Sequence, residues 1–107
     1  MNQLANQTMN QNADQYGLDS PRAQALLNAA RAMGPALRER RARCKAEVRV
    51  PDETVAEFAQ AGFFKILQPE QWGGYAMDPQ VFYAVGLEIA RYCPSSAWIL
   101  GVIAVHN

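Results

Sequence analysis

His106 is the side chain best suited to acid–base chemistry, and it is the only histidine of the sequence. An imidazole can orient or deprotonate a substrate hydroxyl near neutral pH. Trp98 precedes it by eight residues, a little over two helical turns, so both side chains can point to nearly the same side of a helix. Two interpretations stay open: the two residues line the wall of a pocket, or they are ordinary core or surface residues.

Other polar groups favour structural roles. A single histidine with no nearby Asp or Glu cannot form a metal cluster, so no metal site is expected. Ser95 and Ser96 lack a base or an oxyanion device, so they are predicted to cap a helix and not to act as nucleophiles. Glu70 and Glu88 have no paired carboxylate at a useful spacing. Gly73-Gly74 lacks the flanking Lys and Ser/Thr of a phosphate-binding loop.

Composition excludes several classes of function. The 107 residues carry ten basic and ten acidic side chains, and this balance argues against nucleic acid or an anionic membrane as the main partner. The longest apolar run, 97–105, is about half of a bilayer span, and no targeting signal is visible. Cys44 and Cys93 lie far apart and match no metal or redox spacing, which indicates a reduced pair. We therefore expect a soluble, cytoplasmic protein.

Helix signals place these residues on an all-α domain of about four helices. Proline follows a capping residue at Ser20-Pro21 and at Asp78-Pro79, which is typical of helix starts. Gly34-Pro35 should kink or break the first helix. The other three helices are expected over 51–61, 79–92 and 97–106. Their predicted buried faces are Val55, Phe58 and Ala59 on the second, and Phe82, Val85, Gly86, Ile89 and Tyr92 on the third, where Gly86 would allow another helix to approach.

Two segments stand apart in composition. Residues 1–18 are rich in Asn and Gln and are predicted to be a flexible tail, which leaves 19–107 as the domain. Six basic residues lie within 38–49. They could form a solvated helix face or a salt-bridge surface between subunits or domains. Nucleic-acid binding is the third interpretation, because no aromatic residues interleave with the arginines. The apolar last helix should be surrounded by protein. Because no stop signal follows it, the chain is expected to be a fragment of a longer protein.

The stretch 62–74, Gly-Phe-Phe-Lys-Ile-Leu-Gln-Pro-Glu-Gln-Trp-Gly-Gly, joins the helices on either side of it. Gly62 can end a helix in the left-handed conformation. A short apolar run follows, Gln68-Pro69 stops any further helix, and Gly73-Gly74 frees the backbone for a sharp turn.

This stretch resembles the N-terminal signature of the acyl-CoA dehydrogenase superfamily, in which an apolar strip leads to Pro-Glu and an aromatic-Gly-Gly turn. The segments 50–53 and 77–79 also fit. Within the superfamily, 78–83 and 95–106 look more like the flavin-dependent aromatic hydroxylases, the oxygenase components of two-component monooxygenases. The resemblance covers the chain from Asp19 to Asn107.

The resemblance implies a helical N-terminal domain followed by a β domain and a C-terminal bundle, assembled as a homotetramer. It implies reduced flavin, FMN or FAD, supplied by a separate flavin reductase, and hydroxylation of a phenolic substrate through a flavin C4a-hydroperoxide. Trp98 would be a wall beside the flavin, and His106 the catalytic group at the substrate hydroxyl. An acyl-CoA dehydrogenase is the first alternative. A non-enzymatic helical interaction module, resting on the basic segment, is the second. The fragment alone is expected to be inactive.

Overall fold

The computed structural model describes residues 17–106, and the side chains of 17–104. Within that range the protein is all-α, as predicted, with no strand. The helices are α2 (Pro21–Ala32), α3 (Gly34–Glu47), α4 (Asp52–Ala61), α5 (Pro79–Tyr92) and α6 (Pro94–His106). Two short 3₁₀ turns, η1 (Phe63–Lys65) and η2 (Glu70–Trp72), lie between α4 and α5. The predicted tail lies outside the described residues, except for Gly17 and Leu18, which form a turn leading into α2.

The predicted helix starts at the two proline signals are confirmed. Ser20 Oγ accepts a hydrogen bond from the Ala23 N–H at 3.1 Å, and Pro21 opens α2. Asp78 does the same for α5, accepting from the Gln80 N–H at 2.9 Å. Each cap satisfies a backbone donor that has no partner in the first helical turn.

The predicted interruption at Gly34-Pro35 is also confirmed, and it splits the expected first helix into α2 and α3. Because of this split, the described residues contain five helices in place of about four. Gly34 has a packing role as well, because a Cβ placed on it would lie 2.7 Å from the Tyr92 ring of α5. The absence of a side chain lets the junction of α2 and α3 approach the end of α5.

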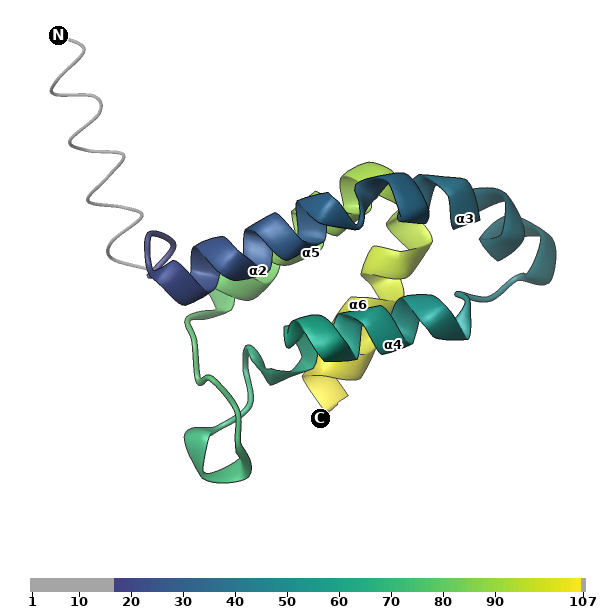
Figure 1. The fold of residues 1–107 in the computed structure, drawn as a ribbon. Coiled ribbons are helices and arrows are strands. Elements are labelled where there is room, and N and C mark those ends of the chain that lie inside the picture. Colours follow the sequence, from purple (N-terminus) through teal and green to yellow (C-terminus); the bar gives the residue numbers. More distant parts are fainter. Residues whose placement is uncertain (1–16, 107) are drawn as a thin grey trace, which may run out of the picture.

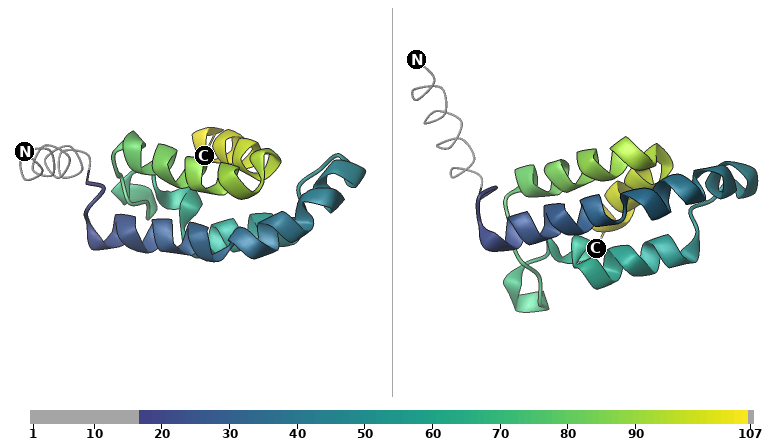
Figure 2. Two further views of the ribbon diagram at one scale, coloured as in Figure 1. Left: turned by 90° about the horizontal axis from the view of Figure 1, so that it is seen from above. Right: turned by 45° about the horizontal axis from the view of Figure 1, so that its top comes forward.

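The helices form two layers (Figures 1 and 2). The α2–α3 rod and α4 lie on one side, and α5 and α6 lie on the other, as the left view of Figure 2 shows. The shortest dimension is 18 Å, against 49 and 37 Å for the others. Since one helix with its side chains is about 10–12 Å across, only two helices fit through this thickness. Each helix therefore has one face toward the core and one face outward.

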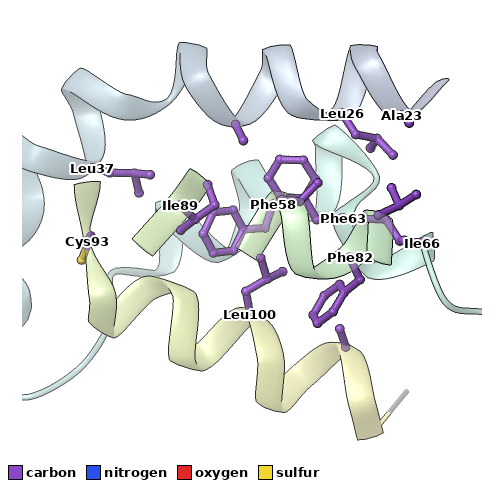
Figure 3. Close-up of a cluster of buried hydrophobic side chains, with 14 of the residues drawn as sticks. Ala23, Leu26, Leu37, Phe58, Phe63, Ile66, Phe82, Ile89, Cys93 and Leu100 are labelled. Atoms are coloured by element: carbon purple, nitrogen blue, oxygen red, sulfur yellow. The ribbon is translucent and has the colours of Figure 1, made fainter. Parts of the chain in front are cut away.

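The core lies between the layers (Figure 3), where Leu100 of α6 and Ile89 of α5 meet Phe58 of α4. All three side chains are fully buried. Some predicted faces were wrong. On α4, Ala59 is exposed and Val55 is only half-buried, whereas the polar Thr54 is buried beside Phe58. On α5, no neighbouring atom lies within 4 Å of the point where a Cβ on Gly86 would be, so no helix approaches it closely.

The stretch 62–74 folds back on itself as a closed loop. Gly62 ends α4 at φ 86°, and Gly73 ends η2 at φ 82°, both in the left-handed region that glycine favours. A Cβ on Gly74 would lie 2.1 Å from the Gln68 carbonyl oxygen, so only glycine fits there. The returning arm of the loop, 75–77, donates its backbone N–H groups to carbonyls of 65–68. The predicted turn is confirmed.

The basic segment is largely a solvated face, as one sequence interpretation predicted, because five of its six basic residues are exposed. Three of its arginines also pair with carboxylates of α4 within the domain, which was not predicted. Arg40 binds Glu57 through two hydrogen bonds of 2.9 and 2.8 Å, and it also donates to Thr54 Oγ1 at 3.2 Å. Arg43 pairs with Glu53 in the next turn of α4. The hydrogen bonds from Arg40 hold the pKa of the Glu57 carboxyl below its ordinary value, against the opposing effect of burial.

Candidate functional site

Helix α6 is apolar on all sides, yet the described chain covers only one of them. Leu100 and Ala104 are buried against the rest of the domain. Trp98 is 73% exposed and Val102 is 43% exposed on the other side. The expectation that this helix is surrounded by protein is therefore wrong for the chain as described. We call the side that carries Trp98 and Val102 the outer face of α6.

A hollow of about 510 Å³ opens beside Trp98, between the first turns of α6 and the end of α3. Its walls are mostly apolar. Val48 ends α3 in the left-handed conformation at φ 54°, and the residues that follow it, Arg49 and Val50, also line the hollow. The lining residues are Cys44, Lys45, Val48, Arg49, Val50, Pro94, Ser95, Trp98 and Ile99. We call this cavity the Trp98 hollow.

Two cations lie at the Trp98 hollow. Arg49 is engaged by Asp52, with 2.6 Å between Nη2 and Oδ1. Lys45 is exposed and has no carboxylate partner among the described residues. An exposed indole with apolar neighbours can stack against a planar ring, and a nearby ammonium favours negative charge. The hollow is thus suited to a planar aromatic ligand that carries an anionic group.

His106 is the last residue of α6, and its side chain lies outside the described residues. Both predicted site residues are on the same helix, as the sequence indicated. Whether their side chains face the same pocket stays a prediction.

The predicted caps at Ser95 and Ser96 were wrong, because α6 begins at Pro94 and includes both serines. Proline is preorganised for a first helical turn, and the Ala97 N–H already donates to the Cys93 carbonyl at 3.2 Å. Ser96 is buried, and its hydroxyl donates to Cys93 Sγ at 3.1 Å. Ser95 instead lines the Trp98 hollow.

Two further polar features escaped the sequence analysis. Glu88 is buried on α5, where it accepts a hydrogen bond of 2.9 Å from the Tyr92 hydroxyl and lies 3.4 Å from Arg91 and 3.8 Å from Arg31. Its spacing of four residues from Tyr92 was a usable signal for this structural role. Cys44 and Cys93, far apart in the sequence, interact with each other in the fold. No spacing rule signals such a tertiary pairing.

Among the described residues, no cluster of three or more His, Cys, Asp or Glu side chains could hold a metal ion. In the same part of the chain, none of the helices has both the length and the apolar character needed to span a bilayer.

Comparison with known proteins identifies the family. The chain is 45% identical over 76 residues to the flavin-dependent monooxygenase, oxygenase subunit HsaA, of Rhodococcus jostii (strain RHA1), covering 71% of this chain and 20% of that protein. The crystal structure of the HsaA monooxygenase from M. tuberculosis superposes with a TM-score of 0.76 at 39% identity, covering 79% of this chain and 23% of that one. The crystal structure of 3-HSA hydroxylase from Rhodococcus sp. RHA1 gives 0.74 at 41% identity, covering 77% and 21%.

The chain thus spans about a fifth of the length of the relatives it matches. The family profile described as acyl-CoA dehydrogenase, N-terminal domain, matches residues 20–107. That range contains every described helix, the closed loop at 62–74 and the Trp98 hollow. The chain belongs to the acyl-CoA dehydrogenase N-terminal domain family.

Proposed function

We propose that this chain is the N-terminal domain of the oxygenase component of a two-component flavin-dependent monooxygenase that hydroxylates a phenolic substrate. The observation that carries the proposal is the similarity to HsaA oxygenase subunits, which extends over 71% of the chain. The outer face of α6 supports it, because an apolar surface that this domain leaves uncovered suits a chamber completed by further polypeptide.

Trp98 is the residue we assign to the flavin. The isoalloxazine ring is planar and aromatic and the cofactor carries phosphate, so it fits the indole, the apolar walls and the Lys45 ammonium of the Trp98 hollow. Reduced flavin, when bound, supplies the activation of molecular oxygen. The role of the outer face is to keep water and stray protons away from that chemistry.

His106 is the residue we assign to the substrate. Placed at the last turn of α6, its imidazole accepts a hydrogen bond from the phenol hydroxyl and favours the phenolate. The added negative charge makes the ring carbon a stronger nucleophile toward oxygen. This assignment predicts that the rate of hydroxylation depends on His106, whereas binding of flavin does not.

The alternatives have less support. An acyl-CoA dehydrogenase shares the domain, but the similar proteins described above are monooxygenases and a hydroxylase. The interaction-module hypothesis rested on the basic segment, where Arg40, Arg43 and Arg49 now have carboxylate partners on α4. For the intact protein we further propose a cytoplasmic homotetramer that takes reduced FMN or FAD from a separate reductase.

The test uses the intact gene product with a flavin reductase and a panel of phenols. We expect oxygen-dependent formation of a hydroxylated product, and we expect His106→Gln to abolish it while hydrogen peroxide is still released. The control is Trp72→Ala, which removes an exposed side chain that is outside both α6 and the Trp98 hollow. If acyl-CoA thioesters bleach the bound flavin and phenols are not hydroxylated, the dehydrogenase alternative is correct and the proposal is wrong.

A further inference from the structure

Two free thiols that are distant in sequence meet where α3 reaches the junction of α5 and α6. Cys44 lies in the last turn of α3, and Cys93 is the single residue between α5 and α6 (Figure 3). Both are buried and neither is in a disulfide. Cys93 has a fixed position, because the Ser96 hydroxyl donates to its Sγ at 3.1 Å. Such an arrangement holds two thiols close enough for an oxidant to join them.

A small cavity gives access to both thiols. It measures about 260 Å³, and Cys44 and Cys93 both line it together with Pro94, Ser95 and the cations Arg41 and Lys45. A molecule the size of hydrogen peroxide fits in this volume. The cavity therefore lets peroxide reach the sulfur atoms, and the thiolate is the form that reacts with it.

We propose that Cys44 and Cys93 form a reversible disulfide when the protein is exposed to hydrogen peroxide. In the first step one thiolate attacks a peroxide oxygen, the O–O bond breaks, and a sulfenic acid forms as one water leaves. In the second step the other thiol attacks the sulfenic sulfur, the S–S bond forms, and a second water leaves. The two sulfur atoms are oxidised together by two electrons, and one peroxide is reduced to two waters.

The environment keeps the reduced pair stable under resting conditions. Burial raises the pKa of the Cys44 thiol, and the neighbouring Cys93 raises it further, although Arg43 acts in the opposite direction. These effects disfavour the Cys44 thiolate, so its oxidation requires an excess of peroxide. The second cysteine of the pair then reacts with the sulfenic acid before that group is oxidised irreversibly.

The bond would act on the candidate site, because Cys44 also lines the Trp98 hollow. Cross-linking it to Cys93 would tie the end of α3 to the residue that precedes α6 and fix the opening of the hollow. The chemistry itself is independent of the proposed function, since the peroxide can be added. Failure of the flavin assignment would leave this inference untouched.

The experiment treats the intact protein with hydrogen peroxide, blocks the remaining thiols by alkylation, and maps the peptides by mass spectrometry. We expect a cross-linked peptide pair containing Cys44 and Cys93 that disappears after reduction with dithiothreitol, together with a higher thermal midpoint before reduction. Ser96→Ala keeps both thiols but frees Cys93, so it should slow cross-linking several-fold. Cys44→Ala and Cys93→Ala, checked for folding by circular dichroism, should each accumulate irreversibly oxidised thiol.

Three results would overturn the inference in the folded wild-type protein. The first is that both cysteines remain alkylatable after peroxide treatment. The second is that each is oxidised to sulfinic acid without a cross-link. The third is that cross-links form only between different molecules.

Discussion

Helices α5 and α6 are neighbours of similar length, 14 and 13 residues, but they use their apolar residues differently. In α5 the large apolar side chains Val81, Val85 and Ile89 are fully buried. In the described part of α6 fewer side chains are buried than in α5. The largest side chain of α6, Trp98, is 73% exposed. The two helices pack against each other, and both expose apolar side chains outward, Tyr83 and Leu87 on α5 and Trp98 and Val102 on α6. What distinguishes α6 is that its exposed Trp98 lines a hollow.

This difference separates folding from function. An amphipathic helix such as α5 is explained by the core that it helps to form. The outer face of α6 contributes nothing to that core, and exposing apolar surface favours aggregation. Since α5 also exposes Tyr83 and Leu87, exposure alone does not select a site, and we assign it to α6 because Trp98 lines the Trp98 hollow.

The largest expected effect distinguishes the two faces of α6. Leu100→Ala should lower the free energy of unfolding of the 107-residue chain by about 2–5 kcal/mol, because it leaves a cavity among Phe58, Ile89 and their neighbours. Val102→Ala on the outer face should cost less than about 0.5 kcal/mol. Urea unfolding followed by circular dichroism measures both. Equal losses would show that the outer face belongs to the core.

Two glycines compare a closely packed position with an open one around α5. Gly34→Ala should destabilise the domain by about 1–3 kcal/mol, since the new Cβ would meet the Tyr92 ring. Gly86→Ala, in the open middle of α5, should stabilise it by up to about 1 kcal/mol through helix propensity. Thermal unfolding of both variants gives the answer. A neutral Gly34→Ala would mean that the α2–α3 junction is not closely packed against α5.

The ion pair between α3 and α4 provides a smaller and pH-dependent effect. Because Arg40 depresses the pKa of Glu57 in the fold, the pair stabilises the protein above the ordinary carboxyl pKa of 4.5. That contribution is lost as the pH falls through the lower pKa of the folded state. Both side chains are partly exposed, so we expect about 1 kcal/mol.

Glu57→Gln is the control for this effect. Its stability should depend less on pH below 4.5 than that of the wild type, when unfolding is measured at several acidic pH values. Parallel curves for the two proteins would show that other carboxyl groups account for the acid sensitivity.

The sequence predicted the features that depend on local chemistry. Helix starts at Ser20 and Asp78, the break before Pro35 and the left-handed Gly62 follow from rules that involve a few adjacent residues. The resemblance carried by 62–74 then supplied the family, which the comparisons bear out. Capping and backbone geometry need no tertiary partner, so these rules succeed where one signal stands alone. They failed at Ser95 and Ser96, because Pro94 begins the helix first.

The sequence did not predict features that arise only when distant segments meet. Thr54 is buried because Arg40 of another helix satisfies its hydroxyl, which a pattern of apolar residues cannot reveal. The proximity of Cys44 to Cys93 and the outer face of α6 depend in the same way on how the helices pack. Of the two predicted site residues, the structure places the Trp98 side chain beside a hollow, whereas the role of His106 rests on the resemblance.

The most direct test of the assignment uses the two tryptophans, because Trp98 and Trp72 are equally exposed at 73% but lie on different elements. In the intact protein, we expect Trp98→Ala to weaken binding of reduced flavin at least about tenfold, a loss of roughly 1.4 kcal/mol, as measured by anaerobic titration. Trp72→Ala, in η2, should leave the affinity unchanged. If the two substitutions have the same effect, or if Trp98→Ala has none, Trp98 is not the wall beside the flavin.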